Sequence, residues 1–217
     1  MTIKAVFFDL DGTLLNTLGD LCRSLNETLE KEGFPTHSCE AIRRFIGDGV
    51  SALVQRALPQ EVGAIPEHVA HYTSIYLRNY ANVSPPQTHV YEGIYPLLRA
   101  LKERDIPLAV VTNKPQPKAL EIVRKFFPDT FVSICGQRDN YPRKPSPAGA
   151  LAISKQLKIP PEETFFIGDS EVDLQTASAG GYFGVAALWG FRTRKELEGY
   201  EAQHYVQHPK EIVSLLP

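Results

Sequence analysis

Residues 3–14 read Ile3-Lys4-Ala5-Val6-Phe7-Phe8-Asp9-Leu10-Asp11-Gly12-Thr13-Leu14. The apolar run over residues 3–8 is rich in β-branched and aromatic side chains, which predicts a strand buried on both faces of a parallel sheet. Two carboxylates, Asp9 and Asp11, follow that run directly, and Gly12 permits a turn that a Cβ would obstruct. Because open parallel sheets bind ligands at the carboxyl ends of their strands, we expect a polar site at this point.

Further apolar runs of similar length predict more strands of the same sheet, over residues 107–111, 131–134, 164–167 and 182–187. Between these runs the apolar residues recur at helical spacing, as in Ala119, Leu120, Val123 and Phe127. The alternation of strands and helices predicts an α/β fold, with a Rossmann-like parallel sheet and helices on both faces.

Residues 17–80 interrupt the alternation, because they show helical spacing and no convincing strand. Ser38 suits a helix N-cap, and Pro66 suits the first turn of another helix. We therefore expect an α/β core domain formed by residues 1–15 and 83–217, and an inserted all-helical cap domain formed by residues 16–82. Residues 83–89, with Pro85 and Pro86, are expected to form the linker that returns to the core.

The composition limits the classes of function. The chain has 217 residues, of which 43% are hydrophobic and 22% are charged, as is usual for globular proteins. A net charge of -2 argues against a nucleic-acid partner. No signal peptide or membrane span is predicted, so we expect a cytoplasmic protein without a membrane partner, as a monomer or weak homodimer. The odd number of cysteines, Cys22, Cys39 and Cys135, favours reduced thiols over a disulfide framework or a zinc site.

Other polar residues that could bind a metal ion or a phosphate group follow predicted strands or precede the next helix. They are Thr112, Asn113, Lys144, Asp169 and Asp173. In a parallel sheet these residues meet Asp9 and Asp11 at one edge. Carboxylates suit a hard cation such as Mg²⁺, whereas an ammonium, a hydroxyl and free backbone amides suit a phosphoryl group.

The ordered set of motifs resembles the haloacid dehalogenase superfamily of phosphotransferases. The motifs are Asp9-x-Asp11-Gly-Thr13, Thr112-Asn113, Lys144-Pro-x-Pro and Gly168-Asp169-x-x-x-Asp173. The helical insertion resembles the α-helical cap of that superfamily. The segments at residues 43–49, 111–115 and 168–170, together with Trp189-Gly190, are most similar to its phosphoglycolate phosphatases.

This resemblance implies a phosphatase with an aspartyl-phosphate intermediate on the nucleophile Asp9. Asp11 would be the general acid and base, and burial beside negative charge is expected to keep it protonated. Mg²⁺ would be held by Asp9, the backbone carbonyl of Asp11 and Asp169, with Asp173 nearby. The phosphoryl group would be bound by Thr112, Asn113 and Lys144. The cap would close over the site, with Arg43 and Gly47 as candidates for substrate specificity.

Several alternatives stay open from the sequence. Arg43 forms either a salt bridge within the cap or a contact with a distal substrate carboxylate. Glu67, His68 and His71 have ligand-like spacing, although a solvated cap surface is the favoured interpretation. A phosphosugar mutase, a pyrophosphatase or a nucleotidase could use the same scaffold, and a phospho-accepting receiver module is the alternative of another class. Phosphoglycolate is the first choice of substrate, and a dehalogenase is disfavoured because it needs neither Asp11 nor Mg²⁺.

Overall fold

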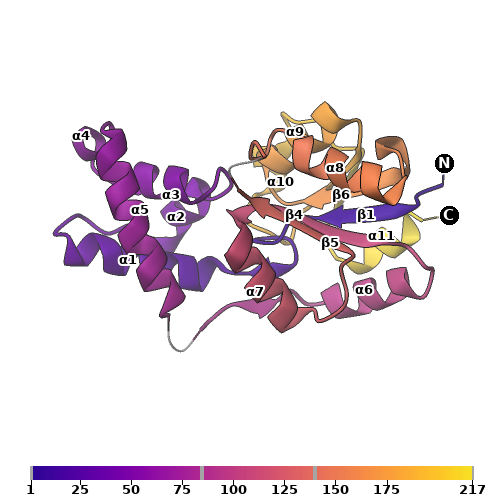
Figure 1. Ribbon diagram of the computed structural model, residues 1–217, viewed down its shortest axis with the longest axis horizontal. Coiled ribbons are helices and arrows are strands. Elements are labelled where there is room, and N and C mark those ends of the chain that lie inside the picture. Colours follow the sequence, from indigo (N-terminus) through magenta and orange to yellow (C-terminus); the bar gives the residue numbers. More distant parts are fainter. Residues whose placement is uncertain (1, 84–85, 139–140, 217) are drawn as a thin grey trace. The chain divides into compact units, whose positions relative to one another are not determined.

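The computed structural model describes residues 2–83, 86–138 and 141–216, drawn as a ribbon in Figure 1. The chain divides into two compact units, one formed by Met1–Leu15 and Val90–Pro217 and the other by Asn16–His89. We call them the α/β unit and the helical unit. The second junction lies later than the predicted boundary at residue 83. The reason is that Asp20 accepts hydrogen bonds from the backbone N–H groups of Gln87, at 2.7 Å, and Thr88, at 2.9 Å, within the helical unit.

The α/β unit contains a six-stranded parallel sheet whose strand order is β5-β4-β1-β6-β7-β8. Its strands are β1 (Ala5–Phe8), β4 (Leu108–Pro115), β5 (Ser133–Gln137), β6 (Thr164–Gly168), β7 (Phe183–Ala187) and β8 (His204–Val206). β1 lies inside the sheet, between β4 and β6. The strand order reverses there, and such a switch point is where an open α/β sheet binds its ligand.

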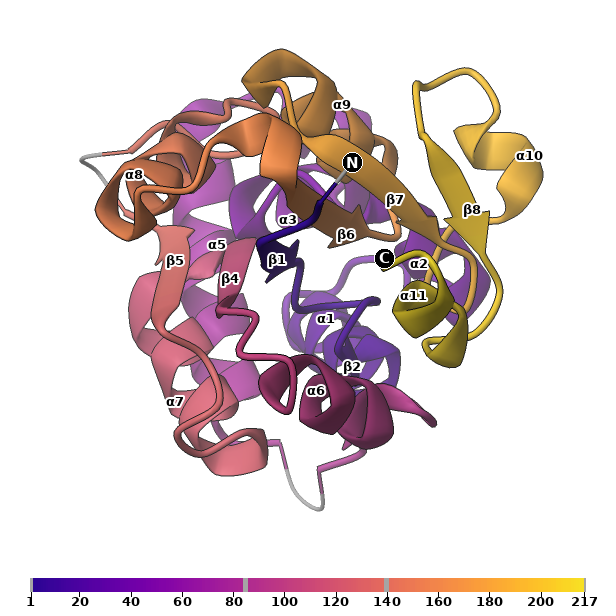
Figure 2. The same cartoon turned by 90° about the vertical axis from the view of Figure 1, so that its right-hand side faces the viewer.

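Helices cover both faces of this sheet, as Figure 2 shows. Val6 and Phe8 of β1 belong to a core cluster that includes residues of α6 (Ile94–Lys102), α7 (Gln116–Phe126) and α11 (Lys210–Ser214). Ala5 and Phe7 belong to the cluster on the other face, with residues of α8 (Ala148–Leu157) and α9 (Glu171–Gly180). The alternation of side chains along β1 therefore buries every residue of the strand, which confirms the interpretation of its apolar run. A 3-10 helix, η1 (Pro161–Glu163), and α10 (Arg194–Leu197) complete this unit.

The helical unit has its own apolar core, to which Leu21, Leu25, Leu29, Ile42 and Tyr76 contribute. Its helices are α1 (Leu18–Lys31), α2 (Cys39–Phe45), α3 (Val50–Ala57), α4 (Gln60–Gly63) and α5 (Pro66–Ala81). As predicted, the side chain of Ser38 caps α2 by accepting from the N–H of Ala41, and Pro66 opens α5. The short strands β2 (Leu15–Asn16) and β3 (His89–Val90) pair with each other. The predicted α/β fold with a helical insertion is confirmed.

The structure differs from the sequence analysis in several strands. The two-residue strands β2 and β3 were not predicted, and β5 begins and ends later than residues 131–134. β8 was not predicted, because its three residues, His204–Val206, are too short and too polar to produce an apolar run. β4 extends beyond the predicted residues 107–111, since pairing with β5 continues at Pro115 after an irregularity in the register. Pro85 of the predicted linker lies outside the described residues. Among the helices that the structure describes, none is long and apolar enough to cross a membrane.

Candidate active site

The end of β1 places Asp9 at the centre of the sheet, beside the end of β6. The backbone N–H of Asp9 donates to the carbonyl of Ile167 at 2.9 Å, and the Asp9 side chain is buried. Gly12 has a φ of +90°, and a Cβ at this position would collide with the carboxylate of Asp169. A Cβ at Gly190 would also collide with Asp169. These two glycines therefore let the loops after β1 and β7 approach the carboxylate that follows β6.

Three buried carboxylates, from Asp9, Asp169 and Asp173, meet at this point. Each offers one oxygen atom, and the three atoms lie within 4.8 Å of one another. Asp169 accepts hydrogen bonds from the Thr13 hydroxyl, at 2.9 Å, and from the N–H of Phe191, at 2.7 Å. These bonds fix the Asp169 side chain, so the cluster is held by its surroundings.

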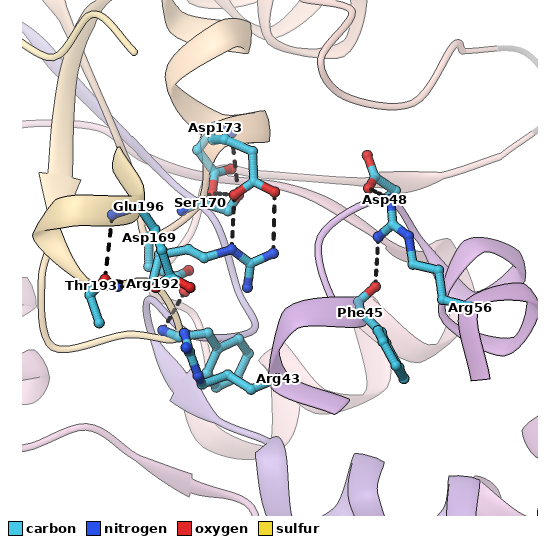
Figure 3. A network of polar contacts seen from close by, with 12 residues as sticks. Arg43, Phe45, Asp48, Arg56, Asp169, Ser170, Asp173, Arg192, Thr193 and Glu196 are labelled. Carbon is cyan, nitrogen blue, oxygen red and sulfur yellow. Dashed lines mark hydrogen bonds and ion pairs between the residues drawn. The ribbon is translucent and has the colours of Figure 1, made fainter. Parts of the chain in front are cut away.

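The start of α9 fixes Asp173 by a capping box, visible in Figure 3. One oxygen of Asp173 accepts from the N–H of Ser170, at 3.1 Å, and from its hydroxyl, at 2.6 Å. The hydroxyl of Ser170 accepts in turn from the N–H of Asp173. The second oxygen of Asp173 is then left to face Lys144, whose Nζ lies 2.6 Å away. Local helix capping thus orients a residue of the candidate site.

Lys144 is buried and contacts two of the three carboxylates. Its Nζ lies 2.8 Å from Asp9 Oδ1 and 2.6 Å from Asp173 Oδ1. The contact with Asp9 is an ion pair, and no other group among the described residues donates a hydrogen bond to Asp9 Oδ1. A buried carboxylate oxygen in that condition suits a group from outside the chain.

The side-chain amide of Asn113 holds the backbone of Lys144. Its Nδ2 donates to the Lys144 carbonyl at 3.0 Å, and its Oδ1 accepts from the Lys144 N–H at 2.8 Å. Thr112 is buried beside it, and its hydroxyl oxygen accepts from the N–H of Lys114 at 3.2 Å. The Thr112 O–H group is a donor that suits an anion.

Burial and like charge shift the protonation of this cluster. Burial raises the pKa of Asp9 to about 6, against the opposing charge of Lys144 and with the added charge of Asp173. Burial, followed by the charges of Asp173 and Asp9, also raises the pKa of Asp169 well above its usual range. For Lys144, burial lowers the pKa, but the attraction of Asp173 and Asp9 outweighs it, and the pKa rises.

The charge of the cluster fits a divalent cation. Three ionised carboxylates and one ammonium leave two negative charges in a buried place, which a divalent ion would balance. Carboxylate oxygens are ligands that Mg²⁺ prefers. In the part of the chain that the structure describes, these three residues form the one group of histidine, cysteine or acidic residues with spacing that suits a metal. Glu67, His68 and His71 instead lie exposed on α5, as favoured from the sequence.

The carboxylate of Asp11 is paired with a cation that the sequence did not predict. Its carboxylate is not part of the cluster of three, and Lys114 Nζ contacts both of its oxygens, at 3.0 Å and 2.9 Å. The expected role of Asp11 as general acid and base stays a prediction. Lys114 was not singled out as a site residue, although it follows Asn113 directly. Its burial, at 6% exposure, is the property that a sequence pattern does not reveal.

The two candidate specificity residues lie in the helical unit. Arg43 donates to both carboxylate oxygens of Glu40, at 3.1 Å from Nε and 2.9 Å from a terminal nitrogen. This is the salt bridge within the cap that was one of its two alternatives. Gly47 lies in the loop after α2 and has a φ of +131°. Figure 3 shows how Arg56 holds this loop through the Phe45 carbonyl and the Asp48 carboxylate.

The chain belongs to the haloacid dehalogenase-like hydrolases, because residues 6–187 match the model of that family. It is 32% identical over 192 residues to the phosphoglycolate phosphatase of Pseudomonas syringae pv. tomato, a match that covers 87% of this chain and 70% of that protein. It is 30% identical over 219 residues to the phosphoglycolate phosphatase of Nitrosospira multiformis, covering 100% of this chain and 96% of that protein.

A solved structure from Lactobacillus delbrueckii subsp. bulgaricus, provisionally assigned as a phosphoglycolate phosphatase, is also similar. It superimposes with a TM-score of 0.92 at 29% identity, covering 100% of this chain and 99% of that one. The family predicted from the motifs is therefore confirmed, and the chain is a hydrolase. Membership of this family excludes the receiver module.

Proposed function

We propose that this protein is a Mg²⁺-dependent phosphomonoesterase that hydrolyses 2-phosphoglycolate. The observation that carries the proposal is the meeting of Asp9, Asp169, Asp173 and Lys144 at the switch point of the sheet. The names of the similar proteins from Pseudomonas and Nitrosospira support the choice of substrate. Among small phosphorylated metabolites, phosphoglycolate is therefore the first to test.

The metal site of the proposal consists of Asp9, Asp169, Asp173 and the backbone carbonyl of Asp11. When bound there, Mg²⁺ shields the charge of the phosphate, so that an anionic nucleophile can approach it. Thr13 and the N–H of Phe191 orient Asp169, and Ser170 orients Asp173. Loss of such a hydrogen bond to a metal ligand typically lowers metal affinity or activity by about 10-fold to 100-fold.

In the first half of the reaction, a carboxylate oxygen of Asp9 forms a bond to phosphorus, and the bond from phosphorus to the ester oxygen breaks. Asp11 gives a proton to the departing alkoxide. In the second half, Asp11 takes a proton from a water molecule, and that water displaces Asp9 from phosphorus. The products are inorganic phosphate and the free alcohol, and Asp9 returns to its starting state.

The charge that develops on the phosphoryl oxygens is met by Lys144 and the Thr112 hydroxyl. Asn113 acts on Lys144, because it bonds both backbone groups of that residue and so holds its backbone in place. Donors placed before the reaction begins stabilise the transition state without a cost of reorganisation. Removal of one such donor typically slows turnover by about 100-fold to 1000-fold.

The test is a panel of phosphate esters, assayed with and without Mg²⁺ on the wild type and two variants. Asp9→Asn should abolish both turnover and covalent labelling by substrate phosphate, and appreciable labelling would refute the role of Asp9. Asp11→Asn should keep Mg²⁺ binding and slow turnover severely. A panel on which pyrophosphate or nucleotides outperform phosphoglycolate would replace the proposed substrate, and isomerisation of a phosphosugar would indicate a mutase.

A further inference from the structure

Among the residues that the structure describes, the α/β unit has two buried lysines, one in β4 and one in the turn before α8, and they contact different carboxylates. Lys144 contacts Asp9 and Asp173, whereas Lys114 contacts Asp11. We propose that Lys114 binds a carboxylate of the substrate, on the leaving-group side of the bond that breaks. Lys114 then selects phosphate esters whose alcohol part carries a carboxylate close to the ester oxygen. This inference rests on the proposed phosphatase function and names the residue that would set its specificity.

The position of Lys114 follows from the position of Asp11. Asp11 exchanges a proton with the ester oxygen, so a hydrogen bond of about 2.7 Å joins these two atoms during the reaction. Lys114 Nζ lies 2.9 Å and 3.0 Å from the two oxygens of Asp11. The ammonium is therefore at most about 6 Å from the ester oxygen.

Covalent geometry then limits which substrates can reach this ammonium. When one carbon separates the ester oxygen from a carboxylate, the carboxylate oxygens lie about 3 Å from the ester oxygen, as ordinary bond lengths dictate. The remaining gap of about 3 Å is the length of an ammonium–carboxylate hydrogen bond. A substrate with a neutral group in that position would not form this hydrogen bond with Lys114.

The backbone around Lys114 fixes its position well enough to discriminate between substrates. The Lys114 N–H donates to the Thr112 hydroxyl at 3.2 Å. A Cβ at Gly136 of the adjacent strand would lie 2.7 Å from the Lys114 carbonyl, so the two strands approach closely here. The register of β4 and β5 shifts between Val111 and Pro115, which is the segment that carries Lys114. Side chains that strands support are held more precisely than side chains on loops.

Two other cations compete for this assignment. Lys144 is engaged with Asp9 and Asp173, which the proposed function places on the phosphoryl side. Arg43 is paired with Glu40 within α2 of the helical unit. Lys114 is buried, belongs to the same strand as Thr112, and already binds a carboxylate through two oxygens. Its chemistry is therefore that of a carboxylate site.

The experiment compares two esters that differ in one charge, 2-phosphoglycolate and ethyl phosphate. Lys114→Met should lower kcat/KM for 2-phosphoglycolate by at least about 30-fold, the loss typical of a truncated buried charge pair. Because Lys114 also contacts Asp11, the substitution affects both esters through that residue. The decisive quantity is the ratio of kcat/KM for 2-phosphoglycolate to kcat/KM for ethyl phosphate, which should fall by at least about 30-fold. An unchanged ratio would contradict the inference. Lys125→Met removes an exposed lysine of α7 and should leave both esters unaffected. If Lys114→Met does not fold, Lys114→Gln keeps a polar side chain and has the same expected outcome.

A binding measurement separates this inference from the proposed function. Calorimetry on the Mg²⁺-loaded wild type should show tighter binding of 3-phosphonopropionate, a non-hydrolysable analogue, than of propylphosphonate. Lys114→Met should remove that preference whether or not the wild type hydrolyses the two esters. If the wild type hydrolyses neither ester, only the proposed function is refuted. The inference is overturned if Lys114→Met weakens both analogues equally. It is also overturned if Arg43→Met removes the preference while Lys114→Met retains it.

Discussion

Asp169→Asn should make the metal-free protein more stable and should remove most of the stabilisation that Mg²⁺ gives. In the wild type, Asp169 lies in the buried cluster with Asp9 and Asp173, whose facing oxygens are within 4.8 Å of its own. At that separation, two unit charges repel by about 3.5 kcal/mol with an effective dielectric constant of about 20. Asparagine removes this charge and keeps nearly the same shape.

The net gain is smaller than the repulsion, because other interactions change too. The variant loses the attraction between residue 169 and Lys144. The hydrogen bond from the N–H of Phe191 then ends on a neutral oxygen instead of a charged one, which weakens that bond by about 1 kcal/mol. The Thr13 hydroxyl donates to the Asp169 carboxylate in the wild type, and the asparagine NH2 can reverse this bond by donating to the hydroxyl oxygen, so the contact is kept. We expect a net gain of about 2 kcal/mol, which raises Tm by about 4–8 °C in a chain of this size.

The pH dependence of stability provides a second test of whether Asp169→Asn stabilises the metal-free protein. The pKa of Asp9 is about 6 in the folded state and 3.8 in the unfolded chain. Between these two pH values the folded chain therefore binds more protons than the unfolded chain. The metal-free wild type therefore loses stability as pH rises through that window, by about 3 kcal/mol for Asp9 at about 1.4 kcal/mol per pKa unit. Because Asp169 contributes in the same direction, the advantage of Asp169→Asn should grow from pH 4 to pH 7.

Urea unfolding and thermal melts at pH 4 to 7, with and without Mg²⁺, provide the assay. Mg²⁺ at 100 times its Kd should stabilise the wild type by about 2.7 kcal/mol and the variant by much less. Glu103→Gln removes one exposed negative charge of the α/β unit and should change neither quantity. The reasoning fails if metal-free Asp169→Asn is less stable than the wild type at pH 7, or if it keeps the full Mg²⁺ effect.

Three further substitutions test other parts of the structure. Gly12→Ala should destabilise the protein by at least about 2 kcal/mol in urea, because φ is +90° and the new Cβ collides with Asp169; an unchanged midpoint would contradict the packing. Asp20→Asn should cost about 2 kcal/mol, because its carboxylate accepts three hydrogen bonds from the returning linker. Proteolysis should then cut residues 83–89 faster than in the wild type. Leu25→Ala should cost about 2–5 kcal/mol, since the side chain is 0% exposed, and a smaller loss would mean that the helical core is loosely packed.

Much of the fold could be predicted from the sequence, because the relevant signals are local. The apolar run before Asp9 marks a strand buried on both faces, and the helical spacing after residue 17 marks the insertion. The short strand β8 was missed, since its pairing with β7 depends on a neighbour and not on its own composition. The same dependence explains why β4 is longer than its apolar run.

The sequence by itself determined which residues are candidates for the chemistry, because Asp9, Lys144 and Asp169 each stand where a predicted strand ends or a helix begins. Only the tertiary structure decided how those residues are used. It pairs Asp11 with Lys114 across 103 positions of sequence, and it commits the amide of Asn113 to the backbone of Lys144. The physical reason is that periodicity and motif order reflect interactions between near neighbours. The charge in contact with a buried side chain depends on which distant strands the sheet brings together.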